Sequence, residues 1–497
     1  MLERDPIVII GGGPAGLTAA WLLARHGRHP LVLEKDTQVG GIARTVEYKG
    51  FRFDIGGHRF FTKVRAVQQL WRDMLGTELL KRPRLSRIYY RGKFFAYPLK
   101  PMNALGGLGP INALLVFFSY LWVRLRPITP EVTFEDWVTN RFGRRLYTIF
   151  FKTYTEKVWG IPCSQIGAQW AAQRIKGLSL VSAVLNMLLP KTPRGGHIKT
   201  LIHEFEYPRL GPGMMWDAFH QHLIRHGGLL EFGARDPHRA RQWAGCLGRV
   251  RHDGTHQCVP VSAVVGTLPL RELIHCLSPT PPTEVVAAAD RLRYRDFLTV
   301  AIIIDAPTLF ADNWIYVHGP RVKLGRIQNF KNWSPAMVPD PSKTCLGLEY
   351  FCFEGDGLWS MPDADLVQLG TRELTEIGLL GGASVVDGTV VRMPKAYPVY
   401  DEGYQGAVET ISQYLAGCSN LQVAGRNGMH KYNNQDHSMV TALLAAQNVL
   451  GAHHDVWAIN ADDEYHEAGD VDLGDVFADP TALESTQPHV PPGPATD

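Results

Sequence analysis

The sequence predicts an α/β protein, α+β overall, in which a Rossmann-type domain carries an inserted substrate domain. Three observations lead to this prediction. A β-branched run over residues 7–10 leads directly into a glycine-rich turn and a helical pattern. A second apolar segment ends at an acidic residue about 20 residues further on. Near the other end of the chain, a short apolar segment over residues 421–424 also ends in a glycine and precedes a helical pattern over residues 438–450.

The first glycine-rich turn is a candidate cofactor site. Gly11, Gly13 and Gly16 have the spacing G-x-G-x-x-G. In this pattern the glycines allow the tight turn, the approach of backbone to a pyrophosphate, and the close packing of helix on strand. The helix that starts near Pro14 and Ala15 would then direct its N-terminus at the diphosphate. Glycines kept only for packing are the alternative.

The next segment favours a flavin dinucleotide. Glu34, followed by Lys35, ends the second strand, where a carboxylate would bind an adenosine ribose 2′-OH and would repel a 2′-phosphate. Two glycine pairs then bracket an arginine and let backbone lie along an extended dinucleotide. These further candidate cofactor-binding residues are Gly40, Gly41, Arg44, Gly56 and Gly57. The sequence therefore predicts bound FAD.

Composition and charge limit the partners. The 497 residues are 45% hydrophobic and 20% charged, as expected for a globular chain of two or more domains. Seven scattered cysteines without a C-x-x-C pair favour reduced thiols in a cytoplasmic protein and give no reason to expect a metal. All 51 Lys and Arg precede residue 432, so the body is basic and would attract an anionic small molecule. The sequence contains no dense run of Lys and Arg interleaved with aromatic residues, so nucleic-acid binding is not expected. The oligomeric state stays open.

The domains are expected to be interwoven. Residues 1–65, 205–275 and 396–455 are predicted to form a discontinuous FAD-binding domain. Residues 80–200 are predicted to be a helical insertion, and residues 290–395, with alternating apolar patterns, a mainly antiparallel sheet. A cleft between the two domains would hold the flavin ring and the substrate. The acidic, proline-rich residues 462–497 are expected to be a disordered tail.

One uncharged segment, residues 104–123, allows two interpretations. Three glycines and a proline in its first third leave the apolar helix too short to span a bilayer. A helix buried in a large domain is the preferred interpretation. A peripheral contact with a membrane surface is the alternative.

The glycine and arginine pattern resembles a known group of flavoenzymes. Residues 7–63 resemble the FAD-dependent amine oxidase and protoporphyrinogen oxidase superfamily, and three segments resemble UDP-galactopyranose mutases more narrowly. Residues 56–62 are similar to the mutase loop beside the flavin. Residues 154–160, followed by Arg174, are similar to its Y-T-x-K-Q-W-G stretch and the arginine after it. Gly425-Arg426, Tyr432 and Asp436 reproduce the spacing G-R-x5-Y-x3-D.

The resemblance implies a role for each matching residue. Gly425 and Arg426 would lie against the diphosphate and the flavin edge, and Asp436 would receive the ribityl hydroxyls. The candidate cofactor-binding residues of these segments are His58, Gly425, Arg426, Asp436, His437 and Ser438. The candidate substrate-binding residues are Trp159, Arg174, Tyr397 and Tyr432. The candidate catalytic residues are His58, Arg174 and Arg426.

The resemblance also implies an activity. A mutase-like enzyme would act on a sugar nucleotide or a related diphosphate-linked sugar through N5 of the reduced flavin, without net redox change. The chain departs from the mutase pattern at Gly57, Phe61 and Val158. The alternative is therefore an FAD-dependent oxidase, dehydrogenase or desaturase acting on a sugar, an amine or a lipid-like substrate. An FAD-binding protein that has lost catalysis is a third class.

Overall fold

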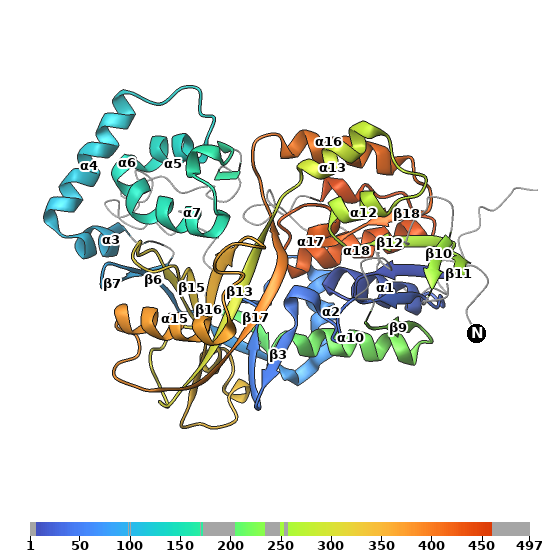
Figure 1. The fold of residues 1–497 in the computed structure, drawn as a ribbon, viewed down its shortest axis with the longest axis horizontal. Helices are drawn as coiled ribbons and strands as arrows, with labels where there is room; N and C mark the ends of the chain where they lie inside the picture. Colours follow the sequence, from blue (N-terminus) through green and yellow to red (C-terminus); the bar gives the residue numbers. More distant parts are fainter. Residues whose placement is uncertain are drawn as a thin grey trace, which may run out of the picture.

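Two sheets organise the computed structural model, which describes residues 6–97, 99, 101–168, 170–171, 204–233, 249–252 and 257–459 (Figure 1). One is a five-stranded parallel sheet of order β18-β12-β1-β2-β9, and the other is a seven-stranded mixed sheet of order β17-β13-β16-β15-β14-β6-β7. The predicted fold class, with a Rossmann-like domain and a second part that contains its own sheet, is confirmed. The predicted tail, residues 462–497, lies outside the described residues.

The parallel sheet draws its strands from three distant stretches of the chain. The apolar run of β1 pairs with β2 on one side and β12 on the other, and every pairing is parallel. Such strands are buried on both faces, which explains their continuous β-branched runs. The strands are β1 (Ile7–Ile10), β2 (Leu31–Leu33), β9 (Leu229–Glu231), β12 (Ala263–Gly266) and β18 (Leu421–Val423).

Helices from both ends of the chain cover this sheet. Helix α1 (Pro14–Arg25) packs against α18 (Gln435–Val449) and against α10 (Gly213–Arg225). Both α1 and α18 are almost entirely buried, because their alanines and leucines let the two helices approach closely. The remaining helices of this part are α2 (Arg65–Leu75), α12 (Leu270–Cys276), α13 (Thr283–Arg291), α16 (Tyr404–Ala416) and α17 (Gly425–Gly428).

The mixed sheet belongs to the second part of the fold. Helix α15 (Asp363–Glu376) packs on its strands β13 and β17. Its long central strands pair antiparallel, whereas β6 and β14 run parallel. The strands are β6 (Ser86–Tyr90), β7 (Lys93–Ala96), β13 (Tyr294–Ile304), β14 (Trp314–Val317), β15 (Arg326–Asn329), β16 (Thr344–Cys352) and β17 (Val385–Pro398).

The start of the predicted helical insertion is wrong. Residues 80–96 contribute most of β5 (Leu79–Pro83) and all of the β6–β7 hairpin. The hairpin turn has Arg91 at φ 50° and Gly92 at φ 78°, a positive-φ pair that suits a two-residue hairpin. Helices follow only later: α3 (Pro101–Leu108), α4 (Pro110–Leu125), α5 (Phe134–Phe142), α6 (Arg144–Tyr147) and α7 (Thr153–Trp159).

The preferred interpretation of residues 104–123 is also wrong. Helix α4 lies at the edge of the molecule, and only Val116 and Val123 of its side chains are buried. Ile111 is 76% exposed and Leu125 is 79% exposed. Within the described residues, no helix is long and apolar enough to cross a bilayer. The apolar side chains on the outward face of α4 are therefore part of the protein surface.

A buried carboxyl group links two of the small two-stranded sheets, β3-β4 and β5-β8. Asp54, at the end of β4 (Phe51–Asp54), is fully buried and accepts a 2.7 Å hydrogen bond from the Tyr207 hydroxyl on β8 (Glu204–Pro208). Burial raises the pKa of Asp54 well above its usual range, although hydrogen bonds from Tyr207 and Thr45 oppose the rise. The pKa of Asp54 is therefore higher in the folded protein than in the unfolded chain. The contribution of Asp54 to the free energy of unfolding is fully present below the pKa of the unfolded chain, and it is lost as the pH rises through the pKa of the folded protein.

Asp54→Asn is therefore expected to raise the melting temperature at neutral and alkaline pH. The amide removes a buried ionisable group and still accepts a hydrogen bond from Tyr207. The gain should shrink toward about pH 4, where the unfolded carboxyl also becomes protonated. Melting curves of both proteins across this range give the comparison. A melting temperature lowered equally at every pH would contradict the argument.

Candidate functional site

The first glycine turn leaves the N-terminus of α1 uncovered. Gly11 has φ +107°, and a Cβ on Gly16 would lie 1.8 Å from the carbonyl oxygen of Gly11. No side chain is tolerated at Gly16, because the clash is with backbone. Gly13 is the N-cap of α1 in an extended conformation and has no side chain to cap the helix. The first amide groups of α1 therefore face outward, an arrangement that favours an anion.

Two further glycine turns meet the first. The Gly40 amide donates a 2.8 Å hydrogen bond to the Gly12 carbonyl, and a Cβ on Gly41 would lie 3.3 Å from the Gly13 Cα. On the other side, Gly425 has φ +81° and a Cβ there would lie 2.8 Å from the Ala15 Cβ. Side chains would fill the cradle that these bare backbones form. Its shape fits the diphosphate of an extended dinucleotide.

Glu34 stands beside this cradle at the end of β2. It is buried, and its two carboxylate oxygens accept backbone N–H groups of Gly12 at 2.7 Å and Asp36 at 2.9 Å. Each oxygen keeps acceptor capacity for a ribose hydroxyl. Arg44 forms a 2.9 Å ion pair with Asp36, and Lys35 is exposed. Glu34 thus has the predicted placement, whereas the charge of Arg44 is partly neutralised.

Several buried polar atoms beyond the cradle have no hydrogen-bond partner among the described residues. In the described structure, no hydrogen bond reaches His58 Nδ1, Asn427 Oδ1, the Asn433 side-chain amide or Gln435 Oε1. Orphaned buried polar atoms are costly in a folded protein and require an explanation. They lie in the two loops for which the sequence predicts contact with the flavin. This observation, together with the glycine cradle, shows that the residues fit FAD.

The start of α18 adds three predicted residues to this region. Asp436, His437 and Ser438 are all buried in its first turn, and His437 Nδ1 lies 3.1 Å from Asp436 Oδ1. The Ser438 amide donates to the Asn434 carbonyl. An acidic side chain at a helix N-terminus is stabilised by the helix dipole. The contacts predicted for these residues with a ribityl chain stay a prediction.

His58 is held as a neutral imidazole. Burial, together with the nearby guanidinium groups of Arg426 and Arg326, lowers its pKa to about 3. The ring belongs to the loop of Gly56 and Gly57, which lies against the mixed sheet. A neutral ring near these arginines suits contact with an uncharged heterocycle and does not compete with Arg426 for an anion.

An aromatic wall surrounds Arg426. The Tyr397 and Tyr432 rings are stacked, with centroids 5.4 Å apart and an interplanar angle of 14°. The Arg426 guanidinium lies 5.4 Å and 4.8 Å from these two rings, and it donates to the carbonyls of Ala396 and Asn433. No described carboxylate forms an ion pair with it. The wall therefore presents an unneutralised positive charge among ring faces.

Trp159 is part of the same wall. Its ring is buried and lies 6.0 Å from that of Tyr432, centroid to centroid. Buried Arg295 holds the end of α7 in place by donating to the carbonyl oxygens of Val158 and Phe351. Arg295, which the sequence analysis did not name, therefore fixes the end of α7, and with it Trp159, against β16. Arg174 lies outside the described residues, so its substrate role stays a prediction.

Sequence reasoning missed a second arginine. Arg326 on β15 pairs in register with Glu349 on β16, and its Nη2 lies 2.5 Å from Glu349 Oε2. Gln328 donates to the other oxygen at 2.7 Å, and it lies close enough to contact a Cβ on Gly57. Burial opposes the charge of Arg326, but Glu349 and nearby tyrosines raise its pKa well above the usual value. Two charged residues in neighbouring strands form no recognisable motif, although both lie in the segment 290–395 that was predicted to be a mainly antiparallel sheet.

Comparison with known proteins agrees with this geometry. Residues 9–74 match the family described as NAD(P)-binding Rossmann-like domain. The chain is 54% identical over 50 residues to an inactive all-trans-retinol 13,14-reductase of Danio rerio, a match covering 10% of this chain and 8% of that protein. It is 35% identical over 131 residues to flavin-containing amine oxidase A of Equus caballus, covering 25% and 23%. The chain thus spans less than a quarter of the length of either relative.

Among solved structures, reduced UDP-galactopyranose mutase is similar over nearly the whole chain. The TM-score is 0.78 at 22% identity, and the match covers 93% of this chain and 99% of the mutase chain. At this identity the likeness shows a shared fold. The shared fold includes both the parallel sheet and the inserted part, because the match covers 93% of this chain.

Proposed function

We propose that this chain, which has the fold of the FAD-dependent amine-oxidase-like superfamily, is an FAD-dependent enzyme acting on a sugar nucleotide or a related diphosphate-linked sugar. The observation that carries the proposal is Arg426, a guanidinium without a described carboxylate partner, which lies beside the stacked rings of Tyr397 and Tyr432. Guanidinium groups suit phosphate oxygens, and aromatic faces suit the rings of a base or a sugar.

The chain's residues have separate tasks in this proposal. Bound FAD supplies the reactive isoalloxazine ring, and the chain supplies binding, orientation and electrostatics. Gly13, Gly41 and Gly425 would leave room for the cofactor diphosphate, and Glu34 would accept a hydrogen bond from the adenosine ribose. His58 would contact the ring as a neutral donor or acceptor.

The substrate side depends on charge and exclusion of water. Arg426 and the predicted Arg174 would neutralise a diphosphate, which makes it a better leaving group or holds it in place. Trp159 and Tyr432 would cover the sugar and keep bulk water out. The charge of Arg326 is already neutralised by Glu349. Arg326 would therefore orient the substrate by hydrogen bonds and contribute little net charge to the site.

A net oxidoreductase is the second candidate. The relatives matched by sequence include an all-trans-retinol 13,14-reductase and a flavin-containing amine oxidase, although each match spans a small part of the relative. Hydride transfer needs little more than a C–H bond positioned over the flavin ring. The same aromatic wall would serve a neutral substrate, and the unpaired charge of Arg426 would then face only the cofactor.

Anaerobic titration with nucleotide sugars separates the two candidates. The purified holoenzyme is reduced, mixed with a panel of nucleotide sugars, and followed by flavin absorbance and by chromatography of the sugars. An isomeric product with the flavin still reduced supports the mutase-like class. If only the oxidised enzyme responds, and its flavin bleaches in proportion to substrate, the protein is an oxidoreductase.

Arg174→Ala is expected to weaken nucleotide-sugar binding roughly 10- to 100-fold, as the loss of a charge-assisted hydrogen bond does. Flavin content and melting temperature should stay unchanged. Calorimetric titration of the nucleoside diphosphate measures the loss. Arg209→Ala removes a surface arginine that is paired only with Glu78, and it should leave binding intact. Unchanged binding in Arg174→Ala would remove Arg174 from the site.

A further inference from the structure

Helix α4 presents its apolar face to solvent. Eight large apolar side chains of this helix are exposed, with Trp122 at 63% and Phe118 at 57%. They recur at i, i+3, i+4 and i+7, the spacing of one helix face. A surface helix normally turns such a face toward the core. The eight residues, called here the α4 apolar face, are Ile111, Leu114, Leu115, Phe117, Phe118, Leu121, Trp122 and Leu125.

The opposite side of α4 is anchored firmly. Val116 and Val123 are buried, and a Cβ on Gly143 would lie 2.8 Å from the Tyr120 amide nitrogen. Ser119 accepts a hydrogen bond from the Arg145 amide, and Asn112 accepts one from the Arg145 side chain. The described chain therefore fixes the helix with its apolar face outward. The exposure is not a consequence of a loosely placed element.

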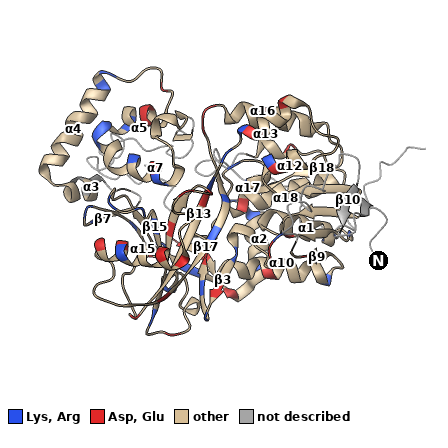
Figure 2. Cartoon of the chain, viewed as in Figure 1, with Lys and Arg blue, Asp and Glu red and all other residues tan. Residues whose placement is uncertain are grey.

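Positive charge surrounds the α4 apolar face. Helices α3 and α4 contain no Asp or Glu, as Figure 2 shows, and α4 ends in Arg124 followed by Arg126. On the inner side, a cavity of about 610 Å³ lies between α4, α6 and the β6–β7 hairpin. Its lining includes four cationic residues, Arg91, Lys93, Arg144 and Arg145.

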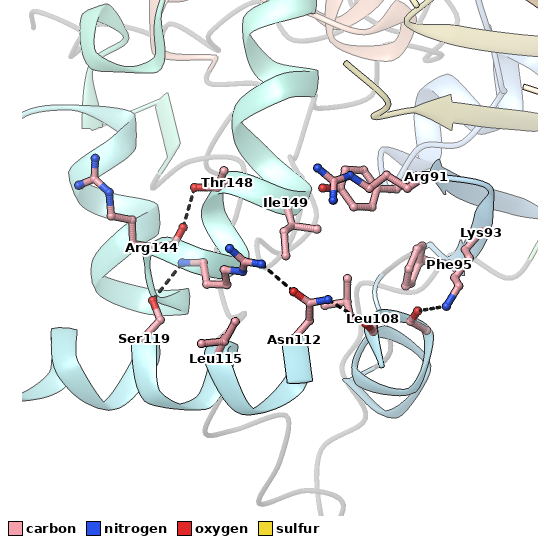
Figure 3. Close-up of a pocket in the computed structure, with 13 residues that line it drawn as sticks. Arg91, Lys93, Phe95, Leu108, Asn112, Leu115, Ser119, Arg144, Thr148 and Ile149 are labelled. Carbon is pink, nitrogen blue, oxygen red and sulfur yellow. Dashed lines mark hydrogen bonds between the residues drawn. The ribbon is translucent and has the colours of Figure 1, made fainter. Parts of the chain in front are cut away.

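The cavity is lined by both cationic and apolar side chains. Figure 3 shows Arg91 and Lys93 on one side, next to the β6–β7 hairpin, and Arg144 on the other, from α6. Arg144 pairs with Glu135 at 3.2 Å, and the Lys93 ammonium donates to the Gly107 carbonyl. The rest of the lining combines apolar side chains, among them Leu108, Leu115, Phe95 and Ile149, with the polar side chains of Asn112, Ser119 and Thr148. One member, Leu115, belongs to the α4 apolar face.

We propose that α4 and this cavity form a membrane-docking surface that binds an anionic phospholipid bilayer. The α4 apolar face would enter the acyl region of one leaflet, with the helix lying parallel to the bilayer. Arg124 and Arg126 would meet headgroup phosphates. The cavity would take the phosphate of one lipid against Arg91 and Lys93, with acyl carbon against Phe95 and Leu108.

Charge favours a bilayer over a second copy of the chain. Two copies joined through the α4 apolar face would bring their basic rims together without acidic residues on α3 or α4 to neutralise them. Like charges at a closed interface cost binding energy. A phosphate surface is complementary to the rim, and each Lys or Arg near an anionic bilayer strengthens binding about fivefold.

Vesicle sedimentation with the full-length holoprotein tests the proposal. Vesicles of phosphatidylcholine mixed with phosphatidylglycerol should bind the protein at least ~10-fold more tightly than vesicles of phosphatidylcholine alone, and added salt should weaken the binding. Phe117→Ser/Phe118→Ser/Trp122→Ser should reduce binding at least ~10-fold. Arg91→Gln/Lys93→Gln should reduce binding to the anionic vesicles ~10-fold and leave the weak binding to neutral ones unchanged.

Matched variants elsewhere control for loss of apolar area and of charge. Val386→Ser replaces an apolar residue that is 54% exposed on β17, and Arg321→Gln replaces an arginine whose side chain is 75% exposed. Neither should change vesicle binding. Flavin content and circular dichroism of every variant should equal those of the parent, because α4 lies far from the glycine cradle.

Three results would overturn the proposal. The first is absence of binding to the anionic vesicles. The second is self-association of the parent protein in sedimentation velocity, lost in the Phe117/Phe118/Trp122 variant, together with absence of vesicle binding. The α4 apolar face would then bind a second copy of the chain. The third is binding that glycerol phosphate abolishes and the apolar variant leaves intact, which would mean an anion site without insertion.

Discussion

Gly16→Val is expected to yield a protein that purifies without flavin and with strongly reduced stability. A Cβ at this position would lie 1.8 Å from the Gly11 carbonyl oxygen and 3.2 Å from the Ile9 side chain, so strand and helix must move apart. Overpacking of this kind costs about 1–3 kcal/mol or more, and it also displaces the amides that would face the diphosphate. Absorbance of the purified protein and urea unfolding measure the two effects.

Two companion variants separate the loss of the cofactor from unfolding. Gly13→Ala places its Cβ no closer than 3.9 Å to another atom, at φ −82°, so the fold should persist while flavin affinity falls. Gly406→Ala lies in α16 with nothing within 4 Å and should retain full flavin. A Gly13→Ala protein with undiminished flavin content would argue against the cradle as the cofactor site.

Glu349→Ala is expected to destabilise the folded protein by about 3–5 kcal/mol, because it leaves the Arg326 guanidinium buried without its partner. Glu349 is fully buried and also accepts from Gln328, so no water replaces it easily. Urea denaturation measures the change. Glu354→Ala, just beyond the same strand in an exposed position, should have little effect.

The paired replacement distinguishes charge from packing at this site. Arg326→Met/Glu349→Leu removes both charges and should recover most of the stability lost by Glu349→Ala. Substrate binding should stay impaired if Arg326 directs hydrogen bonds toward the ligand. If the double variant is as unstable as Glu349→Ala, the loss lies in packing around β15 and β16.

The nucleotide half of the site was predictable because its chemistry needs residues at fixed spacing along the chain. Gly11, Gly13 and Gly16 lie on one turn, and Gly425 ends a strand next to it, so local sequence carries the signal. Arg426 and Tyr432 likewise come from one loop. The structure brings them together with Tyr397, which the resemblance alone had indicated.

The other half depends on pairings that sequence does not contain. Arg326 meets Glu349 only because β15 and β16 pair antiparallel in one register. The β6–β7 hairpin did have a local signal, since Gly92 separates two aromatic-rich runs, but an assumed helical insertion obscured it. The outward face of α4 could not be inferred, because an apolar segment has the same composition whether it faces a core or a membrane surface.

The packing of α1 on α18 has a consequence for synthesis of the chain. The first strand and helix emerge from the ribosome early, yet their neighbours β12 and β18 and the helix that covers them emerge much later. Helix α10 can cover one side of α1 once residue 225 has been translated, but the side that packs on α18 has no partner until residues 435–449 follow. That apolar side of the nascent N-terminal region therefore stays exposed until late in translation, which favours aggregation or chaperone binding.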